Sequence, residues 1–255
     1  MSYLKQIVVK NLTISNVDGD KVAVLGDNIT SVLSIDYYEN IFHPTYQFEI
    51  SFVSVDNPLG DLELRGTETA SIEIQHGSGT LEFDNLIVTS FIQNQSESTA
   101  NTFTVRLDPV GTINNEKNRV TKRYSPDVKG TVHVENILKT QIGADEDEID
   151  VEESANPVGF FGNYWRPFKA LYWIAKRSMS GSMPEDGAGT DRVGFLFWQT
   201  KSGYKFKSID TMISDSKKET VFEYVQNDAT SDNPNFDLYN PTFEIDQNII
   251  LQMMN

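Results

Sequence analysis

Seven carboxylates lie between Asp145 and Glu153, the densest group of ionisable residues in the sequence. A glycosidase needs two carboxyl groups in different environments, so that one stays protonated while the other is ionised. A block of similar acids repels itself and remains solvated, which gives its members much the same environment. We therefore expect residues 145–153 to form a flexible surface loop with no catalytic duty.

The same run contains oxygen ligands that could suit calcium, in Asp145, Asp147 and Glu148. It lacks the central glycine and the spaced glutamate that make a calcium-binding loop. A second short motif, Gly-Ser-Gly-Thr at residues 77–80, superficially resembles a phosphate-binding loop. It has no lysine and lies between two strand-like segments, so we interpret it as a hairpin turn.

The histidines are scattered, and each lacks a second histidine at ligand spacing; they are His43, His76 and His133. His43 precedes a proline and is interpreted as a loop residue, and His133 as a polar position on a helix. Cysteine is absent, which removes disulfides, thiolate metal sites and cysteine nucleophiles. We expect a protein that is not an enzyme and has no catalytic residues, metal site or cofactor.

Aromatic residues are densest in one stretch of the second half: Phe160, Phe161, Tyr164, Trp165, Tyr172 and Trp173. We interpret them first as part of a hydrophobic core. Trp173 lies four residues from both Lys169 and Arg177, where an amphipathic ring is common at protein interfaces. A contact between subunits therefore remains the alternative for this cluster.

The first domain, residues 1–110, is predicted to be built of strands, because apolar and polar residues alternate there. Phe48, Ile50 and Phe52 would share one face of a strand, with Glu49 on the other. The alternation recurs around residues 72–74, 81–83 and 103–107. Turn residues separate these segments, which favours an antiparallel β-barrel or sandwich.

The second domain, residues 111–255, is predicted to be α+β, so that the whole chain is α+β and mainly β. One helical period covers residues 134–142 and ends at Gly143, and another begins at Pro167 and buries a stripe at residues 168, 171, 172 and 175. Strands flank a turn at residues 201–203, and Ser208 suits the N-cap position of a short helix. Residues 243–254 turn apolar again, and we expect a partner segment for them.

The net charge of −16 over 255 residues is the wrong sign for binding a phosphate backbone. The excess of acid is greatest before Pro109. No segment approaches the roughly 20 apolar residues of a membrane span. The first ten residues contain too few apolar residues for the core of a signal peptide. We expect the protein to be made and assembled in the cytoplasm.

Three segments in order resemble the baseplate hub proteins of contractile-tailed phages. IDYYENIFHP at residues 35–44 resembles the family's early strand and loop. RPFKALYWIA at residues 166–175 resembles its Arg-Pro-Phe helix, and GFLFWQT with GYKFKSID at residues 194–200 and 203–210 resembles the strand, turn and helix that follow. The order and spacing agree over residues 34–213.

The resemblance implies a structural virion protein that connects the tail tube to the central spike. It implies a barrel related to the tail-tube fold, and a homotrimer that forms a pseudo-hexameric ring in contact with tube, spike and other baseplate proteins. The genome would pass through the channel without specific binding. Members of the family usually continue past the point where this sequence stops, so we expect another segment or another chain to complete the second barrel.

Two alternatives remain open. A tail tube or tube-terminator protein would also be acidic and free of cysteine, but would lack the helical region near residues 166–178. A carbohydrate-binding tail module is the alternative from another class. For the hub, we expect an acidic channel wall, to which Glu49, Glu73 and Glu82 on the polar faces of strands would contribute.

Overall fold

The computed structural model describes residues 8–16, 18–19, 22–24, 31–54, 65–66, 68–76, 79–94, 101–181 and 194–216. All of them belong to one compact unit, Ile7–Lys218. Strands dominate the first half, and helices alternate with short strands in the second. The fold is therefore α+β and mainly β, as predicted. The apolar segment at residues 243–254 lies outside the described residues.

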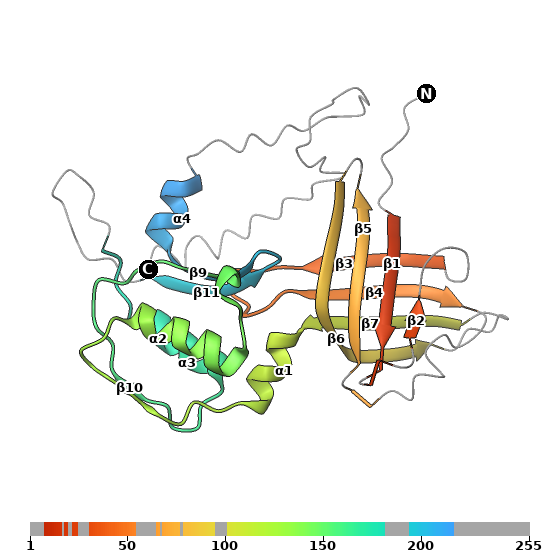
Figure 1. The fold of residues 1–255 in the computed structure, drawn as a ribbon. Coiled ribbons are helices and arrows are strands. Elements are labelled where there is room, and N and C mark those ends of the chain that lie inside the picture. Colours follow the sequence, from red (N-terminus) through yellow and green to blue (C-terminus); the bar gives the residue numbers. More distant parts are fainter. Residues whose placement is uncertain are drawn as a thin grey trace. The chain divides into compact units, whose positions relative to one another are not determined.

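Seven strands of the first half form one antiparallel sheet in the order β2–β1–β5–β6–β7–β4–β3 (Figure 1). The strands are β1 (Val8–Ser15), β2 (Val22–Val24), β3 (Ser31–Tyr38), β4 (Gln47–Ser54), β5 (Thr69–His76), β6 (Gly79–Asn94) and β7 (Asn101–Pro109). The four alternating segments predicted from the sequence lie in β4, β5, β6 and β7. The prediction of strands at these positions is confirmed.

Strand β6 is long enough to serve both halves of the sheet. Its first part pairs with β5 as far as Ile87, and its second part pairs with β7 from Leu86 onward. Where the two parts meet, Asp84 and Asn85 lie opposite Ser71 alone, which makes a β-bulge. Asn85 has φ of +55°, a left-handed conformation that asparagine tolerates better than most residues. The sheet bends here, and in Figure 1 β1 and β5 run across β4 and β7.

The alternating apolar residues of the sheet gather in one hydrophobic core inside the curl. In β4, buried and half-buried residues alternate strictly, and Phe48, Ile50 and Phe52 are almost wholly buried. Fully burying such side chains stabilises the fold by about 1.5–3 kcal/mol each. Other members of this core are Leu12, Ile14, Ile72, Leu86, Phe103, Val105 and Leu107.

The curled sheet is a half-barrel whose outermost strands are β2 and β3. Within the described residues, no pairing joins these two strands to each other. The predicted antiparallel barrel is thus observed as an open, curled sheet with the apolar faces inside and the polar faces outside.

Among its described residues, the second half contains four α-helices and two small sheets. The helices are α1 (Val110–Lys117), α2 (Gly130–Ile137), α3 (Pro167–Ala175) and α4 (Ile209–Ser216), and a π-helix, Leu138–Ile142, extends α2. One sheet has the order β11–β12–β9, and the other pairs β10 with β8. These strands are β8 (Arg123–Tyr124), β9 (Ile149–Val151), β10 (Phe160–Phe161), β11 (Phe195–Thr200) and β12 (Gly203–Ser208).

Most of the predicted helix signals are confirmed. The π-helix after α2 ends at Gly143, which has φ of +79°, a conformation suited to glycine. On α3, Phe168, Leu171 and Ala175 are buried, so the predicted stripe is core. The Oγ of Ser208 accepts a hydrogen bond from the Thr211 amide at 3.1 Å, as expected of a helix cap.

One helix was not predicted. Helix α1 occupies the polar stretch after Pro109, where the sequence shows no apolar stripe. It buries Asn115, whose side-chain oxygen accepts a hydrogen bond from the Phe168 amide at 2.8 Å. The first turn of α3 is therefore capped by a residue from α1, not by a residue of its own N-terminus.

Residues 145–153 lie at the surface, as predicted, but the prediction that they form a loop is wrong. Glu146–Glu148 form a 3₁₀-helix closed by a capping box between Asp145 and Glu148. The chain continues as β9, which pairs in parallel with β12. Distant residues hold the carboxylates: Glu152 accepts a hydrogen bond from the Ser208 amide at 2.7 Å, and Glu153 pairs with Lys129.

A second hydrophobic core lies among α2, α3 and the β11–β12 hairpin, and it is centred on Val134, Ile137, Leu171, Phe197 and Phe206. Buried members of the first core come from residues 12–107 and those of the second from residues 120–206. The division into domains at residues 1–110 and 111–255 stays a prediction.

Candidate interaction surface

The residues weighed for catalysis lie on separate elements. His43 lies in the turn that follows β3, and His76 ends β5. His133 lies on α2 as predicted; it is buried, and its Nε2 is 3.1 Å from the carbonyl oxygen of Ser125. Among the residues that the structure describes, no three His, Asp or Glu side chains gather as a metal-binding group.

Residues 77 and 78 of the Gly-Ser-Gly-Thr motif lie outside the described residues, and Gly79 and Thr80 begin β6. His76 and Gly79 are paired across the antiparallel ladder, so only two residues join the strands. The antiparallel pairing of β5 and β6 agrees with the predicted hairpin.

Strand β3 lies at one edge of the sheet. It pairs with β4 on one side, and on its other side no strand follows among the described residues. The pairing register shifts between Val32 and Ser34, so Leu33 is the extra residue of a β-bulge and is 60% exposed. Two adjacent apolar residues interrupt the period-two pattern at this point of the sequence, and that interruption is the signal of the bulge.

The turn that follows β3 also exposes apolar side chains. The Oδ1 of Asn40 accepts a hydrogen bond from the Phe42 amide at 2.8 Å, and the Asn40 carbonyl accepts one from the His43 amide at 3.0 Å. The Phe42 carbonyl in turn accepts a hydrogen bond from the hydroxyl of Tyr172 on α3 at 3.2 Å. We call β3 and this turn the β3 edge region; its exposed apolar side chains are Val32, Leu33, Tyr37, Tyr38, Ile41 and Phe42.

Tyr37 anchors the β3 edge region to the sheet. Its ring lies 4.9 Å from the ring of Phe48 and 5.6 Å from that of Phe83, measured between centroids. Burial raises the pKa of Tyr37, and the hydrogen bond that its hydroxyl donates to Glu39 raises the pKa further. Tyr37 is therefore neutral at physiological pH.

The aromatic cluster of the second half divides between core and surface. Phe160 is buried and stacks on Tyr124 at 4.5 Å, whereas Phe161 and Tyr164 are 61% and 76% exposed. The remaining members, Trp165, Tyr172 and Trp173, are half-buried against the second core. The core interpretation therefore holds for most of the cluster.

The ring of Trp173 is covered by the side chain of Arg177, which follows it by four residues. The guanidinium of Arg177 lies 3.8 Å from the Trp173 ring centroid, and the Lys169 ammonium lies 5.2 Å from that of Trp165. Because Trp173 and Arg177 are four residues apart in the sequence, they were predicted to be neighbours on one helix face. Whether this surface contacts another subunit stays a prediction.

The polar face of the half-barrel carries the carboxylates that the sequence pointed to. Glu49 forms an ion pair of 3.0 Å with Arg106 of the adjacent β7. Glu73 and Glu82 lie directly opposite each other on β5 and β6, a like-charge pair that is unfavourable in an isolated sheet. The outer face near β5 and β6 is therefore acidic.

No known protein family matches the sequence, and no curated protein matches it. Solved structures are similar to parts of this chain. The 43 kDa tail protein of prophage MuSo2 from Shewanella oneidensis has a TM-score of 0.49 and 11% identity, over 77% of this chain and 53% of its own. A tail protein from Neisseria meningitidis MC58 has a TM-score of 0.45 and 10% identity, over 78% of this chain and 51% of its own.

A third solved structure comes from a secretion machine. The E. coli c3393 protein, a type VI secretion component described as similar to T4 phage tail proteins, has a TM-score of 0.42 and 14% identity, over 79% of this chain and 46% of its own. This chain spans about half the length of the solved structures it matches. No helix within the described ranges is long and apolar enough to cross a membrane.

Proposed function

We propose that this chain is a structural subunit of a contractile phage tail, the central baseplate hub that joins the tail tube to the spike, with no enzymatic role. The β3 edge region carries the proposal. Residues 35–44, the first segment that resembles the hub family, form the end of β3 and the exposed turn after it. One of the segments that resemble the family thus lies at a sheet edge with exposed side chains.

An exposed apolar edge strand is a liability in a protein that stays alone, because its free backbone groups can pair with any other strand. Charges or a covering segment usually protect such an edge. In the β3 edge region the exposed side chains include Leu33, Tyr38 and Phe42. Another copy or another tail protein would cover them, which favours a ring; we propose a homotrimer with pseudo-hexameric symmetry, in contact with the tube, the spike and other baseplate proteins.

The acidic outer face suits a channel through which DNA passes. Carboxylates repel the phosphate backbone, so a wall that carries Glu73 and Glu82 would leave the duplex free to slide. In the ring we propose that this face is turned toward the axis and that the genome meets no specific binding site. The protein would act in the virion, after assembly in the host cytoplasm.

The test combines a measurement of mass with electron microscopy of the purified full chain. A closed ring of three copies is expected, and Leu33→Lys should reduce its population, because a charge at the bulge blocks pairing at the β3 edge. Val132→Lys is the matched control, since Val132 on α2 is exposed to a similar degree, 52% against 60% for Leu33. Equal loss of the ring in both variants, or no ring in the unaltered protein, would refute the proposal.

Two other outcomes would favour the alternatives. Open-ended filaments in the micrographs would indicate a tube protein, since a hub stops at one ring. The exposed rings of Phe161 and Tyr164 are the type of surface that sugars bind. Specific signals on an array of envelope glycans that are lost in Tyr164→Ala would indicate a carbohydrate-binding tail module.

A further inference from the structure

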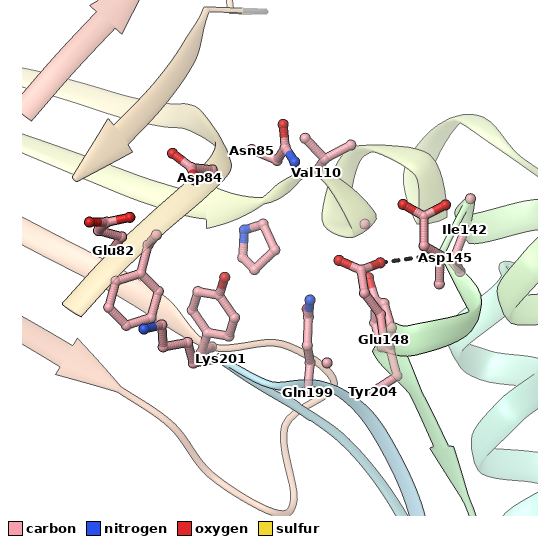
Figure 2. A pocket seen from close by; sticks show the side chains of 17 residues that line it. Glu82, Asp84, Asn85, Val110, Ile142, Asp145, Glu148, Gln199, Lys201 and Tyr204 are labelled. Carbon is pink, nitrogen blue, oxygen red and sulfur yellow. Dashed lines mark hydrogen bonds between the residues drawn. The ribbon is translucent and has the colours of Figure 1, made fainter. Parts of the chain in front are cut away.

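A pocket of about 330 Å³ lies where β6, the start of α1, the 3₁₀-helix Glu146–Glu148 and the β11–β12 hairpin meet (Figure 2). Its size falls at the lower end of the range of small-molecule sites, which is enough for one long side chain. It belongs neither to the β3 edge region nor to the aromatic cluster of α3. Its chemistry can be derived from its rim and its floor.

The rim of the pocket is acidic. It carries four carboxylates against a single lysine, Lys201; the four are Glu82, Asp84, Asp145 and Glu148. Glu148 accepts a hydrogen bond from the Asp145 amide at 3.1 Å, which fixes its carboxylate at the mouth, as the dashed line in Figure 2 shows. Four carboxylates that line one opening produce a negative potential that attracts cations.

The floor of the pocket is aromatic. Tyr46, Phe83 and Tyr204 line it, and all three are buried. The face of an aromatic ring attracts a cation that lies within about 6 Å of its centroid. The ammonium of Lys201 already lies 5.3 Å from the centre of the Phe83 ring, so one cation of the protein itself uses this surface.

A buried amide also lines the pocket. Gln199 on β11 is only 8% exposed, and Figure 2 shows its amide end extending into the pocket beside Glu148. Among the described residues, its Oε1 has no hydrogen-bond partner. In Figure 2 the amide nitrogen of Gln199 points into the pocket, and a half-turn about the terminal bond would place the oxygen there instead and present it to a ligand. A buried amide oxygen without a partner is uncommon, and a donor brought by a ligand would satisfy it.

The phenols of the floor stay neutral beside the acidic rim. Burial raises the pKa of Tyr46 to about 12, and the nearby carboxylate of Glu148 contributes to the shift. Burial and Glu148 raise the pKa of Tyr204 in the same way. Since neither hydroxyl ionises at physiological pH, the negative charge of the site lies in the rim carboxylates alone.

We propose that this pocket binds a lysine or arginine side chain of a partner protein. The apolar stem of such a side chain would lie along the aromatic rings, and its charged head would donate hydrogen bonds to Gln199 and to Glu148. The carboxylates do not gather closely enough to hold a bare metal ion, because no metal-binding group is present within the described residues. The inference does not depend on the proposed role in a tail hub.

The test uses N-acetyl-arginine amide and N-acetyl-lysine amide, titrated into the full chain and followed by protein NMR. N-acetyl-citrulline amide, the neutral analogue of the arginine probe, is the control ligand. At least one cationic probe should bind saturably and shift signals of residues at the pocket, whereas citrulline should not. Failure of both cationic probes to saturate, or equal binding of citrulline, would overturn the proposal.

Three variants locate the site. Glu148→Gln keeps an oxygen for the Asp145 amide but removes the charge, and it should weaken binding about tenfold, the size of one charge-assisted hydrogen bond. Lys201→Met removes the competing cation and should strengthen binding several-fold, a gain that misfolding cannot produce. Glu146→Gln is the matched control, because Glu146 lies on the same 3₁₀-helix and pairs with Lys139 outside the pocket. An equal loss in Glu146→Gln would show that the probes respond only to overall charge.

Discussion

Asp150 lies within a run of seven carboxylates, but the charges that act on it come from a distant strand. Its Oδ2 lies 2.9 Å from the ammonium groups of both Lys205 and Lys207 on β12. Burial alone would raise the pKa of Asp150, and the hydrogen bonds from the two lysines outweigh burial and hold the pKa below its usual value. The ionised form of Asp150 is therefore favoured by folding.

A depressed carboxyl pKa implies a stability contribution that depends on pH with a definite sign. Asp150→Asn should lower the free energy of unfolding at pH 7, by at most about 1 kcal/mol because the pair is partly exposed. The variant and the unaltered protein should become more alike in free energy of unfolding as the pH falls through the pKa of the folded carboxyl. That pKa lies below the usual value of about 3.9. Urea denaturation at pH 7 and in the acid range measures both differences.

Asp147→Asn is the matched control for this prediction. Asp147 belongs to the same run and is exposed on the 3₁₀-helix. Its replacement should change stability little at either pH. A cost of Asp150→Asn that stays constant into the acid range would show that the lysine pairs do not stabilise the fold.

Residue-scale contacts could be predicted from the sequence only where they are local. The spacing of four residues placed Arg177 beside Trp173, and the two are 3.8 Å apart. The partners of Asp150 lie 55 and 57 positions further along the chain, and no local pattern encodes them. Composition alone made residues 145–153 look like a solvated loop for this reason.

At the scale of elements, α3 depends on α1. The first residues of a helix have amide groups without partners inside the helix, and a side-chain oxygen usually caps one of them. Arg166, at the cap position of α3, makes no such hydrogen bond, and Asn115 of α1 supplies it from 53 positions away. Stability of α3 should therefore respond to a change in α1.

Asn115→Ala should destabilise the protein by about 0.5–2 kcal/mol, the usual effect of removing a helix cap. Asn115→Asp keeps the oxygen acceptor and should recover much of that loss, since a carboxylate is favourable at a helix N-terminus. Chemical denaturation of both variants measures the difference. An equal loss in the two would mean that Asn115 acts through packing and not through the cap.

Elements with strong periodicity could be predicted from the sequence, and α1 could not. The alternation in β4 and the stripe on α3 both face a core, so burial imposes a repeating pattern on them. Helix α1 buries only Gly111 and Asn115. A helix that buries so small a face leaves no apolar period to detect.

At the scale of the whole molecule, strand order was beyond sequence patterns. Alternation shows that a segment is a strand, but it does not tell which strand lies at the edge. The edge position of β3 follows from pairings such as β1 with β5 and β4 with β7, which join segments that are distant in the sequence. The β3 edge region and the pocket of Gln199 both arise from that long-range order.

A net charge of −16 on each copy makes self-assembly dependent on salt. Repulsion between copies reaches about 30 Å at 0.01 M ionic strength but only about 8 Å at 0.15 M. The proposed ring should therefore be less populated at the lower ionic strength, in samples matched for osmolality with sucrose. Mass measurements at both salt concentrations test this. A more populated ring at low salt would mean that attraction between opposite charges dominates the contact.

The bend in β6 has a consequence for how the sheet folds. One continuous strand supplies hydrogen bonds to β5 along its first part and to β7 along its second. Neither half of the sheet can complete its ladder before β6 is in place, and the loss of β6 would expose both halves at once. The half-barrel should thus form late, after long loops have closed, and come apart as one cooperative unit without a stable half-folded sheet.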